Sequence, residues 1–278
     1  MNYKKFFAGS ALTTLVSLLP GYSFSAPTSA NDSINNNSNS EFYVSMRYSP
    51  AFSRFRDFKI NETGKQSTVR GYSKTQNSVV LNTHNNFDVN DFQFKFDNNL
   101  LLAFNGAIGY SMVGPRVELE IGYESFKTIS TDSYASDKAY KVVALGRANP
   151  LTANNYVTAE INNITTISLM ANACYDIPMH DISLIPYVCA GLGSNFVNIT
   201  KDSLITKFAY QAKAGVSYAV TPEVSLTVGG FYHGVIGTKY EDLHVNYSLL
   251  AAPASKTSAT AEFGLSYFGG ELGVRFTL

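Results

Sequence analysis

The residues of this chain with the plainest covalent chemistry are its two cysteines, Cys174 and Cys189. Each lies in a segment whose side chains alternate between apolar and polar, and a short turn around residues 178–183 separates the two segments. If the segments form a hairpin centred near residue 181 or 182, the thiols lie opposite each other on one face. A disulfide is then expected in an oxidising compartment. Two unpaired thiols are the alternative, because directly opposed strand residues need local adjustment to reach disulfide geometry.

Charged side chains form a second set with chemical potential. In the segment from Gly114 to Lys127 they alternate with apolar residues, as in a strand with one charged and one apolar face. A soluble sheet would turn the charged face to water, whereas a membrane barrel would turn it to the interior. By this alternation, eight charged residues of the chain are expected to face inward: Arg47, Arg116, Glu118, Glu120, Glu124, Lys213, Glu271 and Arg275.

These inward charges allow two interpretations, since buried charges must be paired or hydrated. One is a charged lining for a channel, and the other is a salt-bridged plug. Eight strands leave an interior about wide enough for side chains, which favours the plug.

The four histidines, His84, His180, His233 and His244, show no metal-ligand spacing. His233 could face the interior at a strand end, but no G-x-S-x-G or H-E-x-x-H motif accompanies it. We therefore expect no enzyme activity, no metal site and no cofactor.

The elements that must position these residues are strands. The chain is rich in Phe (19) and Tyr (18), and its charged fraction of 15% is below the roughly 25% of soluble domains. In the last segment the alternation shifts phase, and Gly269-Gly270 is expected to form a bulge there. Eight segments show strand alternation: residues 42–52, 100–111, 114–127, 164–176, 185–199, 207–219, 224–235 and 261–278.

The connections between these strands alternate between long and short. The long ones, residues 53–98, 129–163 and 236–260, are polar and are interpreted as loops. A membrane barrel has short periplasmic turns and long extracellular loops. Aromatic residues of the apolar face gather beside the short turns and termini, as a periplasmic aromatic girdle would. The girdle residues are Phe42, Tyr110, Tyr175, Tyr218 and Phe276.

We therefore predict an all-β fold, a transmembrane antiparallel up-and-down β-barrel of eight strands formed by residues 42–278. Extra strands within residues 53–98 or 129–163 are an open alternative, and so is a soluble β-sandwich. A sandwich would have no reason to sort its aromatic residues toward one end in this way.

The N-terminus carries the features of a secretory signal. Lys4 and Lys5 precede an uncharged run, and Ser23-Phe24-Ser25 supplies a cleavage site, so residues 1–25 are expected to be a signal peptide. Residues 26–41 are expected to be a flexible leader. No later run reaches the roughly 18 apolar residues of a membrane helix. The nearly neutral charge balance argues against a nucleic-acid partner.

Several sequence blocks carry a family resemblance: F-Y-V-S-M-R-Y-S-P-A-F, N-A-C-Y-D-I-P, P-Y-V-C-A-G-L-G, A-Y-Q-A-K-A-G-V-S-Y and F-G-G-E-L-G-V-R-F. In this order they resemble the major surface antigen barrels of Ehrlichia and Anaplasma. The resemblance covers the strands and turns of nearly the whole mature chain and is weaker in the long loops. It implies an outer-membrane location, exposure to host antibodies and, for some members, porin activity.

Pattern and resemblance together predict a bacterial outer-membrane surface antigen at the cell surface. Porin activity, as passive solute diffusion, is one expected role. The alternative is an adhesin that binds a host receptor through residues 53–98 and 129–163. The expected partners are outer-membrane lipid, the barrel-assembly machinery, host antibodies and, for an adhesin, a host receptor.

Overall fold

The structure is a computed structural model, and it describes residues 41–98, 102–112, 114–130, 132–153, 155–179, 183–201, 203–247 and 257–278. The expected signal peptide and residues 26–40 of the expected leader lie outside the described residues. Glu41, the last residue of that leader, belongs to the first strand. No helix among the described residues is long and apolar enough to cross a membrane.

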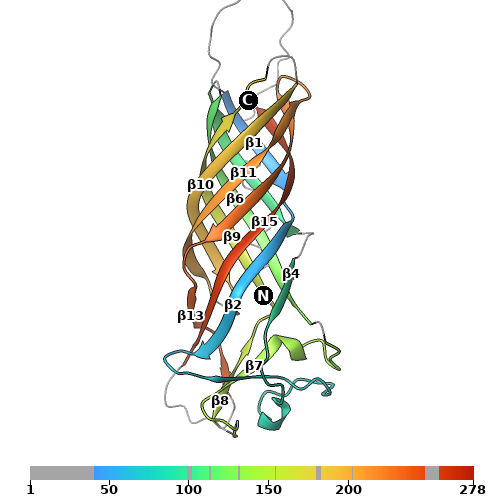
Figure 1. The fold of residues 1–278 in the computed structure, drawn as a ribbon, viewed down its shortest axis with the longest axis vertical. Coiled ribbons are helices and arrows are strands. Elements are labelled where there is room, and N and C mark those ends of the chain that lie inside the picture. The colour runs from blue at the N-terminus through green and yellow to red at the C-terminus, as the bar shows by residue number, and fades with distance from the viewer. Residues whose placement is uncertain are drawn as a thin grey trace, which may run out of the picture. The chain divides into compact units, whose positions relative to one another are not determined.

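Eight antiparallel strands form a closed ring, in which each strand pairs with the next one in the ring (Figure 1). The ring closes where Tyr43 of the first strand pairs with Thr277 of the last. This confirms the predicted up-and-down barrel of eight strands. The ring strands are β1 (Glu41–Tyr48), β5 (Phe104–Ser111), β6 (Pro115–Ile129), β9 (Asn163–Asp176), β10 (Leu184–Asn198), β11 (Ile205–Ala219), β12 (Val224–Val235) and β15 (Ala259–Thr277).

The barrel wall is apolar outside and polar inside. On β6, Leu119 is 49% exposed while its neighbours Glu118 and Glu120 are 4% and 3% exposed. On β15, Leu272 is 58% exposed beside the buried Glu271. This arrangement would be unfavourable in water and is the one that a lipid bilayer stabilises. The fold is therefore a transmembrane barrel, and the sandwich alternative is wrong.

The wall continues beyond the membrane on the side of the long connections, which corrects the prediction that residues 53–98 form a loop. After Pro50, β2 (Ala51–Glu62) pairs with the first half of β15. In the same way β4 (Lys95–Asn98) extends the wall beside β6, and β13 (Lys239–Leu243) extends it beside β15. Pro50 lacks a backbone N–H, so it separates β1 from β2 at a position where the ladder is interrupted.

A second sheet of four strands lies beyond this outer end of the barrel (Figure 1). Its order is β14 (Asn246–Tyr247), β8 (Tyr156–Glu160), β7 (Val142–Gly146) and β3 (Thr68–Gly71). We call the described residues of 63–94 and 132–162, together with β14, the cap; they include the other three strands of this sheet and the short helices η2 (His84–Asn86) and η4 (Ala139–Lys141). Residues 53–98 and 129–163 therefore do contain extra strands, but these do not enlarge the ring.

The prediction of a bulge at Gly269-Gly270 is wrong, and the change in the apolar and polar alternation along β15 has another cause. The pairing of β15 with β12 runs without interruption through Gly269 and Gly270. The irregularity lies instead in β2, where Asp57 adopts a positive φ of 55° opposite the interval between Glu262 and Gly264. A two-residue period is kept throughout β15, but its inward side chains change from polar near the periplasm to apolar near the cap.

Aromatic side chains fill the outer end of the barrel. Phe55 of β2 lies 4.5 Å from Phe96 of β4, and Phe58 stacks on Phe263 of β15 at 4.9 Å, measured between ring centroids. The same cluster includes Leu145 of the cap. One apolar core thus joins the outer barrel to the cap.

Candidate functional site: the barrel interior and the cap pocket

All eight predicted inward charges lie on barrel strands and are buried, with at most 8% of each residue exposed. Their neighbours on the same face include Tyr43, Asp176, Tyr187, Asn172 and Gln211, which the prediction did not list as site residues. The signal for these five residues was the same alternation. Tyr43 shares the parity of Arg47 and Gln211 that of Lys213, while Asn172, Asp176 and Tyr187 share the parity of the cysteine on their strand.

Glu118 of β6 is the centre of one half of the interior network. Its Oε2 atom lies 3.1 Å from Nη2 of Arg47 and 3.0 Å from Nη1 of Arg116. The Tyr43 hydroxyl donates to the same oxygen at 2.9 Å, and Nδ2 of Asn172 donates to Oε1 at 3.0 Å. With four donors, this buried carboxylate is well compensated.

Glu120 and Glu271 form the other half, around the ammonium group of Lys213. Lys213 of β11 pairs with Glu120 and, at 3.2 Å, with Glu271 of β15. Nη1 of Arg47 lies 2.9 Å from Glu120, so Arg47 links the two halves. The Tyr187 hydroxyl donates to Glu271 at 2.7 Å. Strands from all sides of the ring are therefore connected through the interior.

The periplasmic end of the interior is held by Asp176. Its carboxylate lies 2.9 Å from Nε of Arg116 and 3.4 Å from Nη1 of Arg275. The guanidinium of Arg275 also lies 5.1 Å from the centre of the Tyr43 ring, a cation–π distance.

Glu124 faces the interior, as predicted, but does not join the network. It lies farther along β6 toward the cap, opposite Thr166 of β9. Among the described residues no ion pair reaches it. The alternation in the sequence could not distinguish Glu124, which lies outside the ion-pair network, from Glu120, which belongs to it.

Cys174 of β9 and Cys189 of β10 are directly paired in the register and are joined by a disulfide. Sγ of Cys189 lies 3.6 Å from Nη2 of Arg116, so the bridge packs beside the charge network. The Glu118 carboxylate lies within 4.8 Å of both sulfur atoms. Sulfur atoms bonded to each other carry no thiolate for a metal, so this group fits a structural role.

His233 lies at the boundary between the polar and the aromatic parts of the interior. Its ring stacks on Tyr267 at 4.6 Å between centroids. Its nitrogens contact Asn195 at 3.1 Å and Gln211 at 3.4 Å. This histidine is a hydrogen-bonded interior residue.

The structure places the five predicted girdle residues on the outer surface, beside the short turns and the termini. Phe42 and Tyr110 are neighbours, with ring centroids 4.9 Å apart. A second girdle, at the end toward the cap, includes Phe52 and Phe268, whose centroids are 5.9 Å apart, together with Phe208, Tyr210 and Tyr232. The ten residue steps from Phe42 to Phe52 span roughly 33 Å along the chain, which at a strand tilt of roughly 40° corresponds to a height of roughly 25 Å, that of the apolar band of such barrels.

The interior is closed to solvent at the level of the network. Arg47, Glu118 and Lys213, which belong to the network that crosses the ring, are almost fully buried. A continuous aqueous channel would leave such side chains exposed. The geometry therefore fits a salt-bridged plug, with the aromatic core above it.

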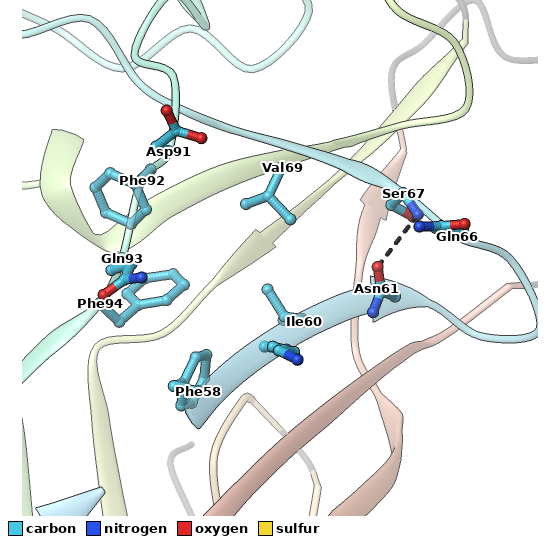
Figure 2. Close-up of a pocket in the computed structure, with 11 residues that line it drawn as sticks. Phe58, Ile60, Asn61, Gln66, Ser67, Val69, Asp91, Phe92, Gln93 and Phe94 are labelled. Carbon is cyan, nitrogen blue, oxygen red and sulfur yellow. Dashed lines mark hydrogen bonds between the residues drawn. The ribbon is translucent and has the colours of Figure 1, made fainter. Parts of the chain in front are cut away.

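A pocket of about 420 Å³ lies where β2 meets the cap (Figure 2). One wall is aromatic, with Phe58 of β2 and Phe92 and Phe94 on the segment that leads into β4. The other wall carries amide groups, and Ser67 N donates to Oδ1 of Asn61 there at 3.2 Å. The remaining lining residues are Lys59, Ile60, Gln66, Val69, Asp91 and Gln93. An apolar wall beside a few directed polar groups is typical of a recognition site.

An ion pair between the buried Glu62 carboxylate and the partly exposed Arg147 fastens the cap to the end of β2. Nε and Nη2 of Arg147 each lie 2.7 Å from an oxygen of Glu62. Burial alone would raise the pKa of Glu62. Hydrogen bonds from Arg147 and Thr257 and the nearby charges of Arg147 and Lys65 outweigh burial and hold that pKa below its ordinary value.

Comparison with known proteins gives two sequence matches. Residues 34–278 match the family model described as "Surface antigen". The chain is also 38% identical to Major surface antigen 4 of Anaplasma marginale over 282 residues, which cover 99% of each chain.

Solved barrels show a more distant similarity. Neisserial surface protein A is 18% identical, with a TM-score of 0.36, and the match covers 86% of this chain and 98% of that protein. The outer membrane protein OprG from Pseudomonas aeruginosa is 13% identical, with a TM-score of 0.39, and the match covers 85% of this chain and 96% of that protein.

Proposed function

Because this chain belongs to the surface antigen family, we propose that it acts at the cell surface through its cap, with a closed plug in place of a pore. The protein is an outer-membrane β-barrel of the bacterial cell surface. The proposal concerns what the barrel does there: it holds the cap outside the membrane, and the cap binds a host surface protein. It assigns no catalytic reaction to the chain.

The observation that supports a closed interior is the burial of Arg47, Glu118, Glu120 and Lys213 in one connected network. Opening a water path would separate charges that now compensate one another, and each separation is costly unless water replaces the lost partner. The aromatic core at the cap end would have to open as well.

Conductance in planar bilayers tests the plug. The mature barrel is expected to give no openings above a detergent control. A large-pore porin reconstituted in the same way is the positive control. Reproducible openings of the wild-type barrel, with a conductance that changes in Lys213→Met, would support a porin and reject the plug.

The pocket supports the cap as the binding surface. It opens on the side of β2 that does not pair with β15, and among the described residues no strand is paired with that edge of residues 54–61. A free strand edge can bind an extended peptide through its backbone, while neighbouring pockets select a side chain. An aromatic or aliphatic side chain suits the wall formed by Phe58, Phe92 and Phe94.

Binding of the purified barrel to host cells tests this role. Gln66→Arg and Gln93→Arg place a charge at the pocket, and we expect each to weaken attachment about tenfold or more, because an unpaired charge would meet an apolar partner. Gln76→Arg is the matched control, since Gln76 is also an exposed cap glutamine but does not line the pocket. Equal attachment by all four proteins would reject the pocket as the binding site.

A further inference from the structure

Two exposed arginines stand on the outer surface of β2 directly beyond the second aromatic girdle. The burial pattern of β2 places Phe52, Arg54 and Arg56 on the same exposed face. Phe52 packs on Phe268 within the girdle, so Arg54 and Arg56 lie at the level where lipid headgroups meet water. Within the described part of the chain, neither guanidinium forms an ion pair.

Hydroxyl groups from the neighbouring strands lie beside the two arginines. In the register, Arg54 is opposite Ser266 of β15, and Ser266 is opposite Gly234 of β12. The Tyr232 hydroxyl interacts with Ser266 and lies within electrostatic range of both guanidinium groups. Tyr210 of β11 lies beside Tyr232, with ring centroids 6.1 Å apart.

Two glycines make room on this surface. The Arg56 side chain lies across Gly264, where its Nε atom is 3.5 Å from the position that a β-carbon would occupy. The Tyr210 ring lies across Gly234 so closely that a β-carbon would be 2.5 Å from it. Both polar side chains are thereby held along the wall, pointing toward the same area between β2 and β11.

We propose that Arg54 and Arg56, with the hydroxyl groups of Tyr232 and Tyr210, bind the phosphate of an anionic lipid in the outer leaflet. Guanidinium groups form paired hydrogen bonds with phosphate oxygens. Phe52 and Phe268 directly below offer an apolar surface to the acyl chains of the same molecule. This continuity with the apolar belt is the reason for choosing a lipid over a free anion.

Native mass spectrometry of the mature barrel in neutral detergent tests the site. The probes are phosphatidylglycerol, phosphatidylcholine and inorganic phosphate. The wild-type barrel is expected to retain phosphatidylglycerol at least tenfold better than phosphatidylcholine. Each basic residue near a membrane surface strengthens the binding of anionic lipid roughly five- to sixfold. Arg54→Gln/Arg56→Gln removes two such residues and should therefore weaken phosphatidylglycerol binding roughly 30-fold.

The matched control is Lys138→Gln/Lys201→Gln, which removes two exposed positive charges from the cap side without touching the girdle. It should bind like the wild type. Unchanged binding in the arginine variant would overturn the proposal, and so would an equal loss in the control. Displacement of phosphatidylglycerol by equimolar inorganic phosphate would also overturn it, by showing an anion site without lipid preference. All variants carry exposed substitutions, and a heat-dependent gel shift verifies that each barrel is folded.

Discussion

Glu120 and Lys213 form an ion pair across the barrel interior, between β6 and β11, which are separated in the ring by β9 and β10. This contact cannot arise from neighbouring positions in a ladder. It exists because the ring is narrow enough for side chains from distant strands to meet.

Replacing Lys213 by Met leaves Glu120 and Glu271 without their shared cation. Glu120 keeps Arg47 and Gln211 as donors, and Glu271 keeps Tyr187. We expect the free energy of unfolding to fall by about 3 kcal/mol, as for a buried pair that loses one partner. Urea titration of barrels in lipid vesicles, followed by gel mobility, measures the change. Adding Glu271→Gln should recover part of the loss, whereas exposed Lys138→Met should have little effect; a wild-type midpoint for Lys213→Met would contradict this prediction.

Acid should weaken the attachment of the cap to β2. The folded-state pKa of Glu62 lies below its ordinary value of 4.5, so its pairing with Arg147 stabilises the cap fully above that value. The contribution is lost as the pH falls from about 4.5 through the folded-state pKa. Hydrogen exchange of residues 142–160, corrected for the intrinsic rate, should therefore be faster at pH 3 than at pH 7.

Arg147→Met should reverse this dependence. Burial would then dominate and raise the pKa of Glu62, so its carboxylate would be most destabilising at neutral pH and least after protonation. Exchange in the variant should be faster at pH 7 than at pH 4. Lys74→Met is the control, because the Lys74–Asp132 pair is about half exposed and contributes little. An Arg147→Met cap that still loosens on acidification would refute the assignment.

The ring could be predicted from sequence because a strand in a membrane wall must alternate with a period of two. The prediction held where the interior is polar, as in β6 between Glu118 and Glu120. It failed in β2, where Phe55 and Phe58 face an apolar interior and Arg54 and Arg56 face outward above the membrane. The polarity of the two faces is inverted there, so the segment resembled a polar loop.

The interior residues could be predicted by parity, but their partners could not. Parity placed Glu120 and Glu124 on one face of β6, yet only Glu120 reaches Lys213, because partners across the ring depend on strand stagger and tilt. The cap strands β7 and β8 were missed for a different reason. They are five residues long and lie within polar connections, so they show too few alternations to be distinguished.

Removing both cysteines should lower the stability of the barrel without changing its fold. The bridge joins residues that are 15 positions apart, and a loop of that size corresponds to about 3 kcal/mol in the chain-entropy model. Cys174→Ser/Cys189→Ser should show this loss in urea titration, since the ring pairing of β9 and β10 is otherwise complete. Alkylation of unfolded wild-type protein without reductant should label neither residue. Full labelling of both would show that the thiols are free.

Gly109→Ala should disturb the interior through Tyr43. The two residues face each other in the β1–β5 register, and a β-carbon on Gly109 would lie 2.2 Å from Cζ of the Tyr43 ring. The ring must then move, and its hydroxyl loses the bonds that it makes with Glu118 and Arg116. We expect a loss of about 1–3 kcal/mol, as for overpacking a tight site.

Gly106→Ala is the matched control for this substitution, because it adds the same methyl group to the same strand at an ordinary contact distance of 3.7 Å from the nearest atom. It should change the unfolding midpoint little. Tyr43→Leu combined with Gly109→Ala should cost less than the sum of the two single substitutions, since the smaller side chain relieves the clash. Strict additivity in this cycle would show that the glycine is not there to accommodate the tyrosine ring.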